Sequence, residues 1–190
     1  MGWNNEIPVD IELLVDKLGI RVVPEINLTI LDLDSFISKD LKTIFISSPI
    51  FDNEIRCRFS VAHELGHARL HKEFLESMSF NSIIEWKKCY QSLEEKITDR
   101  IEKQASIFAS FILMPTSKLE GELKKYFREN LYTISKKEDL IKNCTDLITR
   151  EIVSSEIAVK LGQIFYVSHS AMKWRLYYAQ ETILKVIENL

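Results

Sequence analysis

Residues 58–67 read Arg-Phe-Ser-Val-Ala-His-Glu-Leu-Gly-His, within a stretch at residues 53–74 whose apolar spacing predicts one helix. Four residues of an α-helix span about 400° of rotation and ~6 Å of rise, so His63 and His67 project from one face and can bind a single metal ion. Zinc binds imidazole nitrogens and keeps one tetrahedral position for water at a catalytic site. Glu64 lies beside that face and can take a proton from this water without binding the ion. The spacing predicts a zinc-dependent peptidase, with two ordinary helical histidines as the alternative interpretation.

Gly66 is an unusual residue for the middle of a helix, since glycine there costs roughly 1 kcal/mol relative to alanine. It follows His63 by three residues and borders the face that carries the two histidines. Close approach of another element would explain the missing side chain. We therefore expect a second helix, bearing a third ligand, to pack at Gly66.

The third ligand is expected on a helix predicted over residues 93–114, where apolar residues recur at three- and four-residue spacing. Its acidic residue Glu102 shares a face with small side chains that allow close approach to Gly66. These are Ala105, Ser106 and Ala109. Asp99 lies on the same face one turn earlier and is the reserve candidate. The alternative interpretation of Glu102 is a solvated partner of a nearby lysine.

The other two histidines fit the metal site less well. His71 continues the four-residue series, but its Cα would lie ~12 Å along the axis from that of His63 and be rotated by about 80°. One ion cannot readily bind all three, so His71 is interpreted as a residue that supports a ligand, as a helix-end group or as a surface histidine. His169 stands alone among polar residues.

The N-terminal residues predict a small sheet. A helix is expected at residues 8–18, with Gly19 as its stop. Three extended segments follow before residue 50, at 20–24, 28–33 and 42–47, the last two joined by a polar connection at 35–40. The predicted fold class is α+β, with this sheet packed on a mainly helical, zincin-like domain.

The rest of the chain predicts helices. Residues 75–92 are mixed and indicate a loop with a short helix, and four helices are expected after Pro115, at 117–130, 136–150, 154–164 and 168–179, with Gly162 separating the last two. We divide the chain into a zincin-like domain at residues 1–130 and a helical extension at 131–190.

The last two predicted helices resemble a helix-turn-helix, whose main cations are Lys173 and Arg175. Strong phosphate binding normally needs more cations than these two. We therefore favour two packed helices that complete the core over direct contact with DNA.

Composition and charge restrict the class of protein further. The chain has 190 residues and a net charge of −3, without the basic excess typical of nucleic-acid binding. Cys57, Cys89 and Cys144 form no Cys-x-x-Cys pair, which argues against a disulfide framework and a thiolate zinc site. The sequence contains no run of some 18 apolar residues, so it predicts no membrane-spanning segment. We expect a cytoplasmic protein that does not associate with a membrane.

Three segments together resemble the ImmA/IrrE family of metallopeptidases. They are residues 58–67, Leu70-His71, and Glu-Lys-Gln-Ala-Ser-Ile-Phe-Ala at 102–109 leading into Ile-Leu-Met-Pro at 112–115. In that family the first segment usually has a threonine where Ser60 stands, and the third an asparagine where Ser106 stands. The resemblance covers about residues 7–115.

The resemblance implies zinc on His63, His67 and Glu102, with Glu64 as the catalytic glutamate. It also implies attack of water on a peptide carbonyl, with zinc polarising the carbonyl while Glu64 accepts the proton. Members of the family typically cleave a helix-turn-helix repressor encoded beside them, which releases genes of a mobile element or a stress regulon. The competing hypothesis is a non-proteolytic regulatory protein with a zincin fold that binds repressor or DNA, and the intact Glu64 argues against it.

Overall fold

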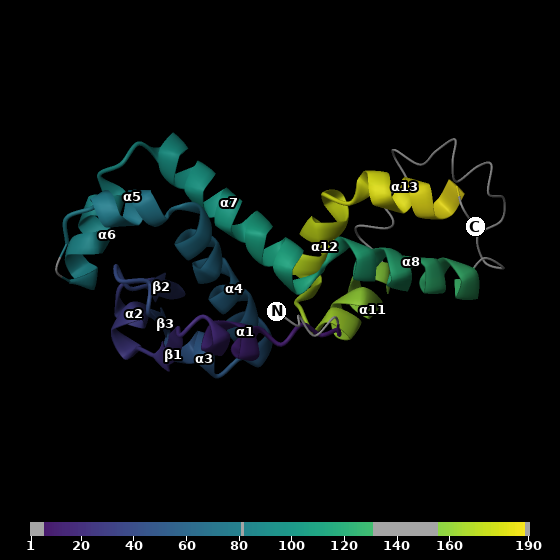
Figure 1. Ribbon diagram of the computed structural model, residues 1–190, viewed down its shortest axis with the longest axis horizontal. Helices are drawn as coiled ribbons and strands as arrows, with labels where there is room; N and C mark the ends of the chain where they lie inside the picture. Colours follow the sequence, from purple (N-terminus) through teal and green to yellow (C-terminus); the bar gives the residue numbers. More distant parts are fainter. Residues whose placement is uncertain (1–5, 81, 131–155, 189–190) are drawn as a thin grey trace. The chain divides into compact units, whose positions relative to one another are not determined.

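The computed structural model describes residues 6–80, 82–130 and 156–188 (Figure 1). Residues 10–109 form one compact unit, and residues 110–130 and 156–188 form a second one together with residues 6–9. The α+β class is confirmed, because the first unit contains a three-stranded sheet and the regular elements described in the second are helices. The predicted domain boundary at residue 130 stays a prediction, since residues 131–155 lie outside the described part of the chain.

The first unit begins with the predicted helix. Helix α1 (Ile11–Lys17) is capped by Asp10, whose side chain accepts a hydrogen bond from the backbone N–H of Leu13 at 2.8 Å. Gly19 has a φ of +69°, a left-handed conformation that glycine adopts without strain, and it precedes strand β1 (Arg21–Pro24).

The sheet has the order β1–β3–β2, so β3 (Thr43–Ile46) is central and β2 (Ser35–Ile37) forms an edge. β1 runs parallel to β3, whereas β2 runs antiparallel to it with Phe36 opposite Phe45. Ile44 and Ile46 of the central strand are both 0% exposed. The sheet therefore contributes to the core of the unit, and among the described residues no strand lies beside the outer edge of β2.

The strand predicted at residues 28–33 is wrong. Helix α2 (Ile26–Ile30) stands there, and β2 is formed by residues that the sequence predicted as a polar connection. Leu28 and Ile30 would share a face in a strand, but Leu28 is 0% exposed and Ile30 is 79% exposed. Glu25 caps the helix by accepting a hydrogen bond from the N–H of Asn27 at 2.9 Å. A local cap and one buried side chain per turn suffice for so short a helix.

Helix α4 (Glu54–Leu70) carries the stretch 58–67 and packs against β2, β3, α1 and the short helix α3 (Ser48–Phe51). The predicted helix at residues 53–74 is correct as far as Leu70. At His71 the backbone turns to φ −123° and ψ 20°, and α5 (Lys72–Ser77) begins beyond it. The short helix expected within residues 75–92 is α6 (Ile83–Gln91).

Helix α7 (Glu95–Leu113) confirms the helix predicted at residues 93–114, and it passes close to α4 at Gly66. A Cβ atom on Gly66 would lie 2.9 Å from the Cα and 3.0 Å from the carbonyl oxygen of Ala105. The close approach inferred from the glycine is therefore confirmed. It brings Glu102, on the same helix as Ala105, to the face of α4 that carries the two histidines.

The substitution Gly66→Ala is expected to lower the free energy of unfolding by about 1–2 kcal/mol, because overpacking against backbone outweighs the ~1 kcal/mol gained in helix propensity. The matched control is Gly121→Ala in α8 (Thr116–Asn130), where an added Cβ meets no atom within 4 Å. That control should be neutral or stabilising. Urea unfolding monitored by circular dichroism measures both, and equal stabilisation by the two alanines would contradict the close contact at Gly66.

The second unit consists of α8, α11 (Glu156–Phe165), α12 (His169–Tyr177) and α13 (Gln180–Glu188). α11 packs against α12, and α13 packs against α8 and α12. The break predicted at Gly162 is wrong, because Gly162 lies inside α11 and the chain turns at Tyr166, whose φ is +54°. The helix predicted at residues 136–150 lies outside the described residues.

Arg175 of α12 is part of the core of the second unit. It is 1% exposed, and its Nε donates to the carbonyl oxygen of Met114 at 3.0 Å. Its Nη2 donates to Oγ1 of Thr116 at 2.9 Å, and the guanidinium lies over the ring of Phe111 at 4.0 Å. One of the two cations of the helix-turn-helix-like segment is therefore committed to internal contacts. No helix in the described ranges is both long and apolar enough to cross a membrane.

Candidate metal centre

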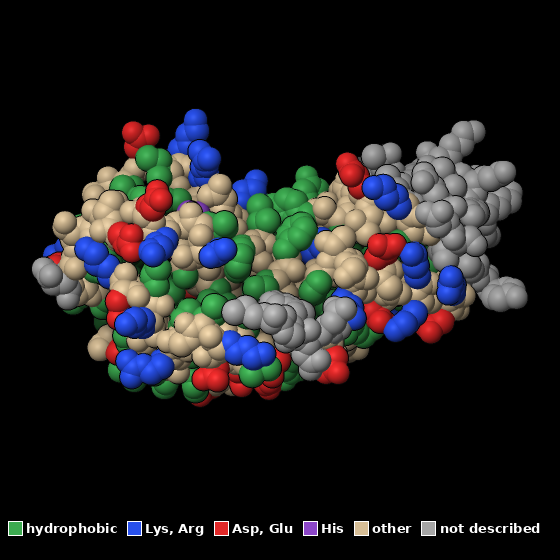
Figure 2. All heavy atoms as spheres, in the orientation of Figure 1, with side chains coloured by type: hydrophobic (Ala, Val, Ile, Leu, Met, Phe, Trp, Pro, Cys, Tyr) green, Lys and Arg blue, Asp and Glu red, His purple; other side chains and the backbone are tan. Residues whose placement is uncertain are grey.

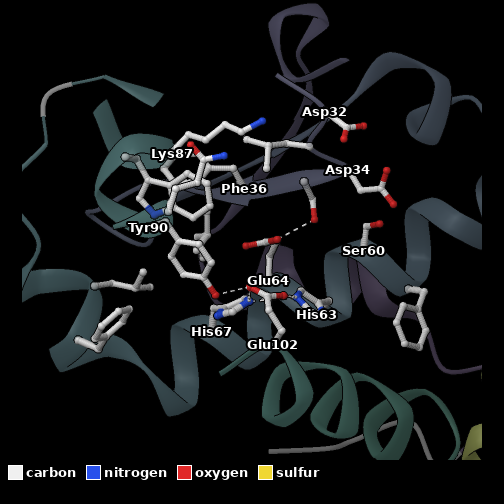
Figure 3. Close-up of a pocket in the computed structure, with 18 residues that line it drawn as sticks. Asp32, Asp34, Phe36, Ser60, His63, Glu64, His67, Lys87, Tyr90 and Glu102 are labelled. Atoms are coloured by element: carbon white, nitrogen blue, oxygen red, sulfur yellow. Dashed lines mark hydrogen bonds and ion pairs between the residues drawn. The ribbon is translucent and has the colours of Figure 1, made fainter. Parts of the chain in front are cut away.

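Helix α4 places His63 and His67 side by side, as their four-residue spacing requires (Figure 3). Their Nε2 atoms lie 3.0 Å apart, and the centroids of their rings are 4.8 Å apart. The side chains are largely buried, with 16% and 10% of their surface exposed. Two imidazole nitrogens therefore converge on one point with little access to solvent.

Glu102 on α7 closes this group from the opposite helix. Its Oε2 lies 3.0 Å from Nε2 of His63, and its Oε1 lies 3.7 Å from Nε2 of His67. Ligand atoms of a tetrahedral zinc site are separated by roughly 3.3 Å when the bonds are about 2.0–2.1 Å long. Two imidazoles and one carboxylate at this spacing fit a single zinc-sized ion. Asp99, the reserve candidate, is exposed and lies outside the group.

The charge of Glu102 is stabilised by its neighbours. Burial by itself would raise the pKa of this carboxyl, but contacts with His63, His67 and Tyr90 outweigh burial and hold the pKa well below its usual range. Burial would lower the pKa of His67, and the contact with Glu102 outweighs that effect and raises it. The site therefore keeps an anionic oxygen beside the two ring nitrogens at neutral pH.

Tyr90 of α6 is a hydrogen-bond donor to the same carboxylate. Its hydroxyl donates to Oε1 of Glu102 at 2.5 Å (Figure 3). Its ring stacks on Trp86, with centroids 5.0 Å apart, and Trp86 in turn packs on Phe36 of β2 at 4.9 Å. Burial and the bond to Glu102 raise the pKa of Tyr90, so the phenol stays protonated. An aromatic stack thus ties the sheet to the carboxylate of the site.

Two further side chains contact the histidines from behind. Oγ of Ser106 lies 3.3 Å from Nδ1 of His63, where a hydroxyl oxygen can accept a hydrogen bond from the ring. His71 is 7% exposed, and its Nδ1 lies 3.2 Å from Nδ1 of His67. His71 therefore contacts a ligand candidate, stays outside the group of three and ends α4, consistent with the first two of its three interpretations. Its burial shows that the third, a surface histidine, is wrong. His169 is exposed at the start of α12.

Glu64 is held beside the group of three without belonging to it. The residue is 5% exposed, and its Oε1 accepts a hydrogen bond from the hydroxyl of Ser35 at 2.6 Å. Ser35 opens strand β2, so the sheet edge fixes the orientation of this carboxylate. A buried carboxylate held beside the three candidate ligands can act as a general acid or base.

A cavity of about 450 Å³ opens onto these residues. Phe36 and Tyr90 form an apolar wall together with Trp86, which packs between them. Asp34 and Lys87 contribute charged side chains to the lining (Figure 3). The cavity therefore places the three candidate ligands and Glu64 beside an apolar wall.

Ser35 and Tyr90 contact the site but were not found from the sequence. Ser35 fell in the predicted polar connection, and Tyr90 fell in the segment at residues 75–92 that carried no clear period. Tertiary packing holds each of them against the site, and residue spacing within one element does not predict such contacts. A weak signal existed for Tyr90, since Trp86 and Tyr90 are four residues apart and so share one helix face.

Comparison with protein families identifies a metallopeptidase-type domain. A peptidase family model described as the IrrE N-terminal-like domain matches residues 15–138, which is more than half of the chain. The chain therefore belongs to this family, and the resemblance to ImmA/IrrE metallopeptidases is confirmed. Comparison with curated proteins gives no match, and neither does comparison with solved structures.

Proposed function

We propose that this protein is a zinc-dependent endopeptidase with His63, His67 and Glu102 as metal ligands and Glu64 as the general base. The observation that carries the proposal is the convergence of two Nε2 atoms and a carboxylate, all within 4.8 Å of one another, at a cavity that Glu64 also lines. Zinc at this position would polarise a peptide carbonyl and lower the pKa of water towards 7. Three protein ligands would leave one coordination position of a tetrahedral zinc for water, as catalytic sites do.

Glu64 performs the proton transfers in this proposal. Its carboxylate accepts the proton of the attacking water and then delivers it to the nitrogen of the departing amine. The hydroxyl of Ser35, 2.6 Å away, keeps one carboxylate oxygen fixed and leaves the other free to act. Burial of Glu64 excludes bulk water from this exchange.

Strand β2 supports a peptide as the substrate. Asp34 and Ser38 make backbone hydrogen bonds to the β3 side, through Ser47 N–H to Asp34 O and Ser38 N–H to Thr43 O. Since backbone groups alternate along a strand, those of Ser35 and Ile37 point to the open edge, and both residues line the cavity. An extended peptide can add to this edge and bring its carbonyl to the site.

For the substrate we propose a cytoplasmic helix-turn-helix repressor of a mobile element or stress regulon, a proposal that rests on the family. The test is co-expression with the neighbouring repressor and mass spectrometry of the intact products, with and without a zinc chelator. One cut that appears only with metal supports the proposal. An uncut repressor in the presence of bound zinc contradicts it.

The competing role, binding of repressor or DNA without hydrolysis, has less support. Arg175 is buried, and on the face drawn in Figure 2 the Lys and Arg side chains are interspersed with Asp and Glu. Phosphate binding requires several cations together. The face drawn in Figure 2 thus gives no reason to prefer DNA over a protein partner.

The substitution Tyr90→Phe is expected to weaken zinc binding about 10-fold, because residues that hydrogen-bond to metal ligands typically contribute 10–100-fold in affinity. Loss of the hydroxyl frees Oε1 of Glu102 to rotate away from the two histidines. Competition with a chromophoric chelator measures the affinity. Tyr177→Phe, at a 47% exposed tyrosine of α12, is the control and should not change it.

A further inference from the structure

The ring of His67 is contacted on the side away from the proposed metal by a second histidine. Nδ1 of His71 lies 3.2 Å from Nδ1 of His67, and the ring centroids are 5.2 Å apart. In a continuous helix His71 would be carried about 80° around the axis from His63. His71 is, however, four residues from His67, and its backbone N–H still donates to the carbonyl oxygen of His67 at 2.9 Å, so the two rings lie against each other.

The other nitrogen of His71 is contacted by α7. Nε2 of His71 lies 3.0 Å from Oε1 of Gln104, two residues beyond Glu102. The helix that supplies the third ligand therefore also supplies the far end of a chain of contacts that leads to the second ligand. His71 is 7% exposed, so these contacts face little competition from water.

We infer that Gln104 and His71 are positioning residues that hold His67 in the tautomer whose Nε2 lone pair faces the metal. The carbonyl oxygen of Gln104 can only accept, so Nε2 of His71 carries the proton and donates it. In a neutral imidazole the remaining nitrogen is then an acceptor, so Nδ1 of His71 accepts from Nδ1–H of His67. This leaves Nε2 of His67 without a proton. The inference rests on the metal centre of the proposed function.

The opposite orientation of the Gln104 amide leads to a site that cannot bind metal. Its NH₂ group would donate to Nε2 of His71, and His71 would then donate from Nδ1 to Nδ1 of His67. Nε2 of His67 would carry a proton and point it at His63 and Glu102. Only the first orientation therefore agrees with a ligand role for His67.

The direct test is ¹⁵N NMR of the histidine rings in the full-length protein, with and without zinc. We expect His71 to carry its proton on Nε2 and His67 to carry one on Nδ1 in both states, with Nε2 of His67 free of a proton when zinc is bound. A proton on Nδ1 of His71 would overturn the inference. The tautomers are read without hydrolysis. A protein with these tautomers that binds zinc but cuts nothing would therefore contradict the proposed function and still support the positioning role of Gln104 and His71.

Substitutions test the positioning role of Gln104 and His71 through zinc affinity. Gln104→Met removes donor and acceptor at nearly constant shape and is expected to weaken zinc binding about 10–100-fold. Gln104→Glu keeps an acceptor and should restore affinity to within a few-fold of the parent. The matched control is Lys103→Met at the adjacent exposed position of α7, which should bind zinc like the parent.

Parental zinc affinity in Gln104→Met would overturn the inference. A loss of zinc affinity in Gln104→Glu as large as that in Gln104→Met would overturn it as well. Circular dichroism establishes that each variant is folded. His71→Phe provides a second break of the same chain, with a ring of similar size and no nitrogen, and is expected to weaken zinc binding like Gln104→Met. If neither variant folds, the ring nitrogens of the parent protein decide the question.

Discussion

Replacing Glu64 with glutamine is expected to slow peptide hydrolysis by about 10²–10⁴-fold, the usual contribution of a positioned general base. The amide has nearly the shape of the carboxylate and can still accept the hydrogen bond from Ser35, but it cannot take a proton from water. Zinc binding should stay within a few-fold of the parent, because Glu64 lies outside the ligand group. Single-turnover cleavage and zinc stoichiometry measure the two effects separately.

The control for this variant is Glu73→Gln, the same change at an exposed position of α5. It should cleave and bind zinc like the parent. A folded Glu64→Gln protein that retained parental cleavage would exclude Glu64 as the base. If it relieved repression in cells without cutting the repressor, the non-proteolytic hypothesis would be preferred.

The parts of the site that could be predicted from the sequence follow short-range rules of the helix. His63 and His67 share a face because of the helical period, and Gly66 indicated contact because a helix interior otherwise disfavours glycine. Glu102 followed from the narrow residues beside it, and Ala105 is the residue that approaches Gly66. In each case the residues that led to the prediction lie within two turns of one helix.

The parts that could not be predicted depend on contacts between distant segments. Ser35 and Glu64 are 29 residues apart, and no spacing rule connects an edge strand to a helix at that distance. The error at residues 28–33 has the same origin, since a short apolar run fits either a strand or a helix and burial of Leu28 alone decides between them. At Gly162 the ~1 kcal/mol cost of glycine was too small to end a helix that packing stabilises.

Zinc should be lost from Glu102→Ala and retained in Asp99→Ala. A zinc site contributes about 10–16 kcal/mol of binding free energy, so removal of one of its few protein ligands is expected to weaken affinity on the order of 10²–10³-fold. The alanine also leaves Tyr90 and the two histidines without the anion that they contact. Asp99 is exposed one turn earlier on the same helix, so its removal tests whether any nearby acid would serve.

Zinc content after dialysis and affinity by chelator competition distinguish the ligands. Glu102→Gln adds a third comparison, because it keeps an acceptor for the Tyr90 hydroxyl and loses only the charge. If the charge is what binds the metal, Glu102→Gln should lose affinity nearly as far as Glu102→Ala. Zinc retained in Glu102→Ala but lost in Asp99→Ala would assign the third ligand to Asp99 instead, and would require α7 to shift along its axis by about one helical turn relative to α4.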